Sequence, residues 1–311
     1  MRFEIIDNND NLILKDTHTN TQAQIYTFGA LLNRFEIEKD GKPVNVIDGY
    51  HSVDHARESV TELHKSAKLT PFVCRLNAGR FSYGGKDFSI KKFNIGPSAI
   101  HGLVFDADFT VSATHIDDHK ATVSLHYDYK TAEHGFPFAF SVNVAYKLEP
   151  ENKLTVRTTI TNHSKEPMPL SDGWHPYFKL GETINTAEVK FNAKEVAEFS
   201  SELLPTGNFF SYNTFNEFKT LGATELDNSF TLNDHDGPAL VMRDREAGVQ
   251  LEIIPDKSYP ILQIYTPPHR KSIAIENLSS VPDSFNNKIG LIDAKPEEKH
   301  IFTTSYKLSL V

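Results

Sequence analysis

The chain of 311 residues carries a formal net charge of -9 and contains 39% hydrophobic and 23% charged residues, which excludes an intrinsically disordered chain. Its 22 Phe and 11 Tyr supply a large core of side chains that favour β-strands. The lysines are dispersed and the net charge is negative, so no basic stripe for nucleic acid or an anionic membrane is expected. We expect one large domain over residues 1–311, because all-β units often exceed about two hundred residues.

The first ten residues and the single cysteine bear on location. The first ten lack the basic start and the long apolar stretch of a secretory signal, and no later segment approaches the length of a membrane span. Cys74 has no second cysteine with which to form an internal disulfide, as is usual in a reducing compartment. The sequence therefore predicts a cytoplasmic protein.

The first element with a clear period is a helix predicted over residues 52–65, with Ser52 as a candidate N-cap. Its apolar residues recur on one face of that helix: Val53, Ala56, Val60 and Leu63. The rest of the chain is dominated by period-two alternation, which is typical of half-buried strands. At most one or two short helices are expected.

Three successive strands are predicted over residues 122–129, 141–148 and 153–160, with turn-forming residues between them. Further strands are expected over residues 248–254, 261–265 and 272–276. Many strands with one helix indicate an all-β fold, a large antiparallel β-sandwich or a barrel.

The most suggestive single residue is His175, in the run Trp174-His175-Pro176-Tyr177-Phe178. The following proline favours an extended backbone at His175. Aromatic faces pack against the apolar face of a sugar ring, and an imidazole with an ordinary pKa near ~6.5 can transfer a proton at neutral pH. A core histidine bonded to a backbone carbonyl fits the same residues, so both interpretations stay open.

Glu276 lies at the end of the strand predicted over residues 272–276, on the same face as the small Ala274. A carboxylate on a mainly apolar strand is costly to bury without partners, which favours a ligand-facing role. A solvated strand end is the alternative.

Three further polar residues have weaker local signals. Arg75 interrupts the apolar run 71–76, and serves either a structural ion pair or a sugar hydroxyl. His101 precedes Gly102, a residue that allows a ligand to approach the backbone closely. Asp227 fits a turn by its local chemistry.

Metal and phosphate chemistry have little support. His115 and His119 flank Asp117-Asp118 at a spacing used by metal ligands, but the segment is predicted to be a hairpin turn rather than a metal site. The sequence has no Gly-rich phosphate loop, no nucleophile-elbow serine and no Cys-His pairing, so nucleotide use and acyl transfer are not predicted.

Taken in order, several of these segments resemble the aldose 1-epimerase (galactose mutarotase) family over most of the chain. The segments are residues 71–76, 79–81, 100–102, 175–180 (His-Pro-Tyr-Phe-Lys-Leu), 204–207, 226–230, 264–267 and 275–277. His-Pro-Tyr-Phe and the late glutamate, in this order, make a specific set. The chain departs from the family pattern at Cys74, where an asparagine is expected, at Asn277, where a proline is common, and in the tail 295–298, which lacks a glycine.

The resemblance implies a galactose mutarotase-like supersandwich and interconversion of the α and β anomers of a free aldohexose such as galactose or glucose, without a cofactor. It makes His175 the general acid and Glu276 the general base. It also makes Arg75, His101 and Asp227 binders of the sugar. The expected partner is a small-molecule sugar, with neither nucleic acid nor membrane, and the expected state is a monomer or weak homodimer.

Three rivals remain. A hexose-6-phosphate 1-epimerase would need extra cations at its site, for which Lys179, Arg80 and Arg243 are available without forming a cluster in the sequence. A glycosidase would use two carboxylates, and Asp227 with Glu276 can be mistaken for that pair. A non-catalytic carbohydrate-binding protein would explain the aromatic residues but not a buried His and Glu that face one ligand.

Overall fold

The computed structural model describes residues 1–130, 135–234 and 236–311, and its strands confirm the predicted all-β class. The three predicted strands correspond to β13 (Ala121–Tyr129), β14 (Phe140–Glu149) and β15 (Lys153–Asn162), which pair in succession as antiparallel neighbours. Their burial alternates along each strand because successive side chains point to opposite faces.

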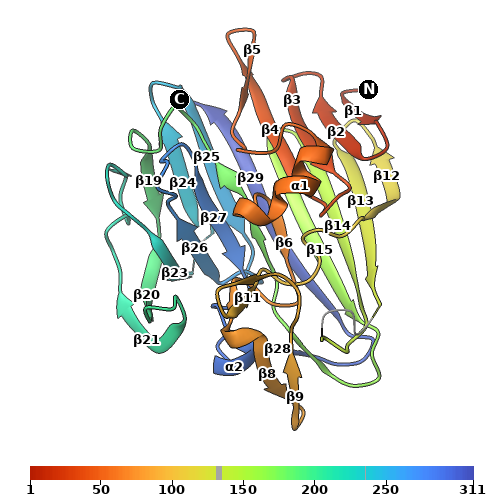
Figure 1. Ribbon diagram of the computed structural model, residues 1–311. Coiled ribbons are helices and arrows are strands. Elements are labelled where there is room, and N and C mark those ends of the chain that lie inside the picture. The colour runs from red at the N-terminus through yellow and green to blue at the C-terminus, as the bar shows by residue number, and fades with distance from the viewer. Residues whose placement is uncertain (131–134, 235) are drawn as a thin grey trace.

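A nine-stranded antiparallel sheet forms one layer of the molecule (Figure 1). Near its centre β29 (Lys299–Leu310) lies between β15 and β25 (Val249–Pro255). The strands outward from β15 are β14, β13 and β12 (Thr110–Ile116). Those outward from β25 are β24 (Leu240–Asp244), β19 (Glu188–Phe191) and β22 (Lys219–Thr220).

Two further sheets pack against this layer. The N-terminal sheet runs in chain order: β1 (Phe3–Asp7), β2 (Asn11–Asp16), β3 (Thr21–Tyr26), β4 (Leu32–Lys39) and β5 (Lys42–Asn45). The eight-stranded sheet has the order β21 (Pro205–Ser211), β20 (Ala193–Phe199), β23 (Asp227–Leu232), β26 (Ile261–Tyr265), β27 (Ile273–Leu278), β17 (Gly173–His175) and β6 (Ala67–Leu69), with β18 (Tyr177–Phe178) also paired to β27.

Tyr146 of β14 shows that both sheets cover the same face of the nine-stranded layer. Its hydroxyl donates to the carbonyl oxygen of Ala30 at 2.7 Å, and its ring lies 6.1 Å from that of Trp174 in β17, centroid to centroid. One contiguous cluster of buried side chains accordingly includes Leu14, Val144 and Ile275, one from each sheet. The arrangement is the predicted β-sandwich.

The predicted helix is confirmed as α1 (Val53–Leu63), and the Ser52 side chain accepts a hydrogen bond from the His55 amide as its N-cap. Val53, Ala56 and Val60 are buried as predicted, whereas Leu63 is only partly buried. The helix ends at His64, whose left-handed backbone (φ 51°) stops the helical hydrogen bonds.

Short elements complete the described chain, and the sequence did not predict the one-turn helix α2 (Ser284–Asn287). The others are the 3₁₀ turn Asn77–Gly79 and the strands β7 (Arg75–Leu76), β8 (Arg80–Tyr83), β9 (Lys86–Ser89), β10 (Asn94–Ile95), β11 (Ser98–Ile100), β16 (Met168–Leu170) and β28 (Ile292–Ala294).

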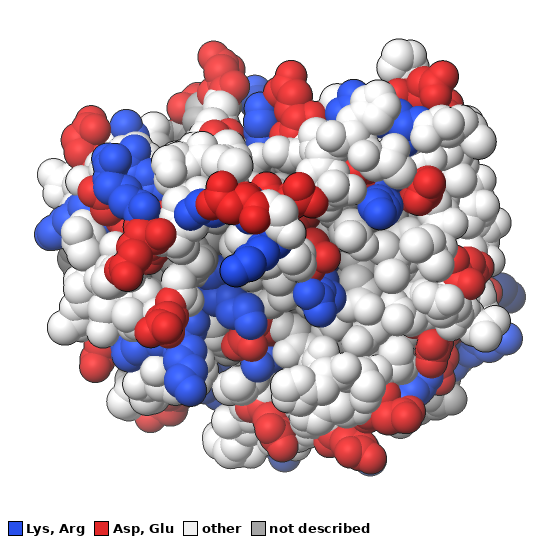
Figure 2. Space-filling model, turned by 90° about the horizontal axis from the view of Figure 1, so that it is seen from above, with Lys and Arg blue, Asp and Glu red and all other residues white. Residues whose placement is uncertain are grey.

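The surface carries charges of both signs. Figure 2 shows Lys and Arg side chains interspersed with Asp and Glu over the face that it displays. No helix within the described ranges is long and apolar enough to cross a membrane.

The segment with His115 and His119 is the β12–β13 hairpin, as predicted, and its Asp117 caps the turn by accepting hydrogen bonds from the amides of His119 and Lys120. Across the residues that the structure describes, no group of three or more potential ligands could hold a metal ion.

Candidate active site

A cavity of about 300 Å³ opens beside the eight-stranded sheet, near the C-terminal end of α1. Its volume is at the lower limit of small-molecule pockets, ~300–1,000 Å³. All five site residues predicted from the sequence line this cavity, although they come from five separate segments of the chain. The lining residues are Glu62, Leu63, His64, Cys74, Arg75, Ile95, Ile100, His101, His175, Tyr177, Phe199, Leu203, Asp227, Gln263, Tyr265, Glu276 and Pro282.

His175 ends β17 in the extended conformation expected before a proline. Its backbone is fixed by pairing with Ala67 of β6 and by the hydrogen bond from the Ser66 amide to its carbonyl oxygen. The side chain of His175 is 7% exposed, and its ring lies 5.2 Å from that of Tyr177, centroid to centroid. The expected aromatic neighbour is therefore Tyr177, while Trp174 points into the core.

Glu276 belongs to β27, whose six residues are all buried. The alternative of a solvated strand end is wrong, because β27 continues to Leu278 and is covered by β26 on one side and by β17 and β18 on the other. A central strand with neighbours on both edges places the carboxylate rigidly at the base of the cavity.

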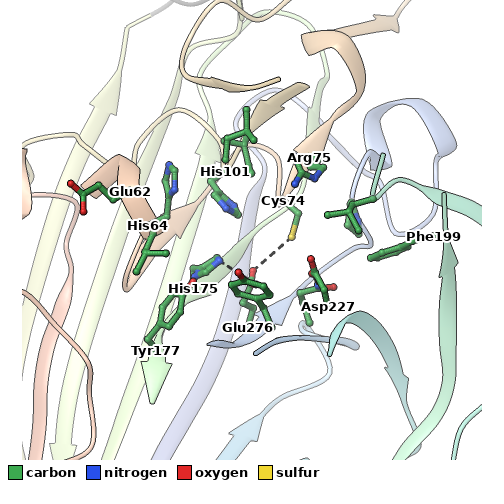
Figure 3. A pocket seen from close by; sticks show the side chains of 17 residues that line it. Glu62, His64, Cys74, Arg75, His101, His175, Tyr177, Phe199, Asp227 and Glu276 are labelled. Carbon is green, nitrogen blue, oxygen red and sulfur yellow. Dashed lines mark hydrogen bonds and ion pairs between the residues drawn. The ribbon is translucent and has the colours of Figure 1, made fainter. Parts of the chain in front are cut away.

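The imidazole and the carboxylate meet directly. His175 Nε2 lies 3.3 Å from Glu276 Oε1, and the thiol of Cys74 lies 3.7 Å from Glu276 Oε2, as Figure 3 shows. Within the described ranges, His175 Nδ1 is buried and has no hydrogen-bond partner. The pair thus retains hydrogen-bonding capacity that the protein itself does not use.

Burial governs the electrostatics of the pair. Burial raises the pKa of Glu276 well above its usual range, and the nearby Asp227 raises it further. Burial lowers the pKa of His175, and the neighbouring His64 lowers it as well. Both shifts oppose net charge, so the two groups hold one exchangeable proton between them and offer one acid and one base.

Two further histidines continue the wall of the cavity. The ring of His101 lies 4.8 Å from that of His175, and the ring of His64 lies 4.7 Å from that of His101. Burial lowers the pKa of His101 well below its usual range and that of His64 to about 4, so both are neutral hydrogen-bonding groups at pH 7. The backbone approach expected at Gly102 is made by Thr70 of the protein itself, because a Cβ on Gly102 would lie 2.2 Å from the Thr70 carbonyl oxygen.

Asp227 lies on the opposite side of Glu276 from the histidines (Figure 3). The turn suggested by its local chemistry is wrong, because Asp227 begins β23 and pairs with Tyr265 of β26. Its Oδ1 accepts a hydrogen bond from Gln263 Nε2 at 2.9 Å. Burial raises its pKa, and the positive charge of Arg75 opposes that rise. Arg75 thus faces a carboxylate across the cavity.

Sequence reasoning missed several lining residues, of which Gln263 had the clearest signal. It is a polar residue inside the apolar strand Ile261–Tyr265 and is only 4% exposed. His64 gave no signal beyond its place at the end of the predicted helix. Cys74, which the sequence singled out only as the lone cysteine and as a departure from the family pattern, contacts the carboxylate of Glu276.

Comparison with known proteins bears on the family and the fold of the chain. The aldose 1-epimerase family model matches residues 12–307. The Escherichia coli (strain K12) protein YihR is 24% identical over 80% of each chain. A galactose mutarotase-like protein from Clostridium acetobutylicum superposes with a TM-score of 0.84, at 22% identity, over 99% of this chain and 98% of its own.

A second solved structure, galactose 1-epimerase from Lactobacillus acidophilus NCFM, has a TM-score of 0.82 at 20% identity, with 100% of this chain and 98% of its own covered. At these identities the structural likenesses establish the galactose mutarotase-like β-sandwich. With the family model matching nearly the whole sequence, the chain belongs to the aldose 1-epimerase family.

Proposed function

We propose that the protein interconverts the α and β anomers of a free aldohexose such as galactose or glucose. The observation that carries this proposal is the contact of an imidazole and a carboxylate, His175 and Glu276, both buried at a cavity of monosaccharide size. The named activity of the Lactobacillus acidophilus relative supports the same reaction.

The proposed reaction moves protons only. With the proton of the pair on His175, the Glu276 carboxylate takes the proton of the C1 hydroxyl while His175 donates its proton to the departing ring oxygen, and the ring opens to the aldehyde. Rotation about C1–C2 presents the other face of the carbonyl, and closure reverses both transfers. Each positioned transfer contributes ~10²–10⁴-fold to the rate. Arg75, His101 and Asp227 are proposed to bind the sugar oxygens, since all three line the same cavity.

The distribution of cations favours a neutral sugar over a hexose phosphate. Arg75 is the one Lys or Arg among the described residues that line the cavity, and Asp227 and Glu276 face the same space. The other candidates lie elsewhere: Arg243 pairs with Glu188 at 2.6 Å, Arg80 lines a separate groove, and Lys179 does not line the cavity. A phosphate would therefore find a single cation, beside two carboxyl groups.

Polarimetry on freshly dissolved α-D-galactose and α-D-glucose tests the proposal. We expect the optical rotation to relax faster than in buffer, in proportion to enzyme concentration, and the ratio of the two rates to identify the preferred sugar. Methyl α-D-galactoside is the matched control, because its ring cannot open and its rotation should not change. Relaxation no faster than in buffer would reject the proposed function, and release of methanol from the control would indicate a glycosidase.

A further inference from the structure

The side chain of Cys74 is held against Glu276 by an unusual backbone. Cys74 has φ 48°, in the left-handed region that non-glycine residues rarely adopt. The conformation is fixed by the hydrogen bond from the His101 amide to the Cys74 carbonyl oxygen at 2.9 Å. It directs the thiol to the cavity, where Sγ lies 3.7 Å from Glu276 Oε2 (Figure 3).

The second neighbour of Glu276 is an imidazole with unused hydrogen-bonding capacity. His175, on the other side of the carboxylate, is 5% exposed, lines the cavity and has an unpartnered Nδ1 within the described ranges. The two oxygens of Glu276 are thus divided: Oε2 faces the thiol, and Oε1 faces the imidazole. A carboxylate has about four lone-pair sites, so Oε1 can still accept from a substrate.

We propose that Cys74 is a positioning residue for Glu276, whose S–H donates to Oε2 and thereby turns Oε1 toward His175 and the anomeric hydroxyl. The catalytic half of this inference rests on the proposed function, whereas the thiol–carboxylate hydrogen bond can be tested without turnover. The groups that face Glu276 are His175 from β17, Tyr177 from β18, Asp227 from β23 and Cys74 itself.

A thiol at position 74 preserves the basicity of Glu276 better than a hydroxyl at the same position would. The S–H group is a weak donor, so it orients the carboxylate while stabilising its negative charge only slightly. A hydroxyl bonds to a carboxylate more strongly, favours the charged form and lowers the pKa of the acid. Cys74 therefore leaves Glu276 with most of the basicity that burial confers.

The single cysteine allows the hydrogen bond to be observed directly, through the infrared S–H stretching band of the whole protein. We expect Glu276→Ala to move this band to the position of an unbonded thiol. Glu62→Ala removes a carboxylate that lines the cavity without a recorded contact to Cys74, and should leave the band unchanged. A band that is the same in wild type and Glu276→Ala overturns the proposal.

The consequence for the base is measured from the pH dependence of kcat/KM for anomer exchange. Cys74→Ser and Cys74→Ala both shorten the side chain, but only serine can donate. We expect the acid limb of the Ser variant to lie roughly half to one pH unit below that of the Ala variant. If the acid limbs of the Ser and Ala variants lie at the same pH, the side chain at position 74 serves packing only and the proposal is overturned. If the wild-type protein shows no anomer exchange, the proposed function is rejected. The infrared measurement then still shows whether the Cys74 thiol donates a hydrogen bond to Glu276.

Discussion

Two buried acid–base pairs each have one member in the four-residue segment 172–175, and they are bonded very differently. The side chains of Asp172 and Lys68 are 0% exposed, and Lys68 Nζ lies 2.6 Å from Asp172 Oδ2. Lys68 also donates to the Gly173 carbonyl oxygen. Asp172 Oδ2 accepts a further hydrogen bond from the hydroxyl of Tyr259 at 2.7 Å. Three residues later, His175 meets Glu276 at 3.3 Å, with a weak thiol as the other recorded partner of the carboxylate.

The difference shows how one short segment, residues 172–175, serves stability and chemistry together. The ammonium of Lys68 also lies 4.4 Å from the ring of Trp174, its partner in the β6–β17 register, so the first pair is surrounded by protein groups. The second pair faces the cavity and is left for a ligand to complete. We expect the first pair to contribute to folding and the second to contribute little to it.

The largest expected effect is on activity. Glu276→Gln and His175→Asn should each lower kcat for anomer exchange by ~10²–10⁴-fold, because each removes one proton transfer. Their free energies of unfolding should change by less than about 1 kcal/mol, since neither leaves a buried charge unpaired. Polarimetry and urea denaturation measure the two quantities. His126→Asn, at a partly exposed histidine 3.0 Å from Asp128, is the matched control and should retain activity.

The next largest effect is expected on stability, at the Lys68–Asp172 pair. Lys68→Met should lower the free energy of unfolding by roughly 3–5 kcal/mol, because it leaves the Asp172 carboxylate buried without its cation. The double variant Lys68→Met/Asp172→Leu should recover part of this loss, since it removes both charges. Urea denaturation of the three proteins tests this, and a single variant as stable as wild type would show that the pair is not needed for folding.

A smaller effect concerns the cost of keeping the cavity histidines neutral. The pKa of His64 is lowered by burial to about 4, so between about pH 4 and 6.5 the unfolded chain binds a proton that the folded protein excludes. Stability therefore falls as the pH is lowered through this window. His64 should account for about 2 kcal/mol of the loss between pH 7 and pH 5.

His64→Asn tests this sign, because asparagine tolerates the left-handed backbone at that position (φ 51°). The variant should lose less stability than wild type between pH 7 and pH 5 in urea denaturation. His51→Asn, at an exposed residue just before α1, should follow the wild-type pH dependence. An equal loss in His64→Asn and wild type would contradict the expected exclusion of a proton.

The smallest effect is expected at the surface. Lys86 and Glu166 lie 3.1 Å apart with side chains 61% and 63% exposed, so water already solvates both charges. Lys86→Ala should change the free energy of unfolding by less than about 1 kcal/mol, and added salt should reduce the difference further. A loss of unfolding free energy as large as that of Lys68→Met would contradict the expectation that a buried ion pair contributes more to stability than an exposed one.

The sequence predicted the parts of this molecule that depend on local period. β13, β14, β15 and α1 follow from alternation, turns and a capping serine, because these patterns act over a few residues. The one-turn helix α2 is too short for a period to be recognised.

The candidate site was predicted only in part. Arg75, His101, Asp227 and Glu276 were joined to His175 through the family resemblance, and local chemistry alone had assigned Asp227 to a turn. The Lys68–Asp172 pair was missed, because its members are 104 residues apart and only the register of β6 and β17 reveals that they meet. The contact between Cys74 and Glu276 was missed for the same reason, since the two residues are 202 positions apart in the sequence.

The central place of β29 in the nine-stranded sheet has a consequence for biosynthesis. β15 and β25 both precede β29 in the chain, and each pairs with it along one edge. Until β29 leaves the ribosome, these edges present unpaired backbone N–H and C=O groups to the solvent and to other chains. The large sheet is therefore completed after translation of nearly every residue that forms it, and the growing chain passes through a stage at which protection from aggregation matters most.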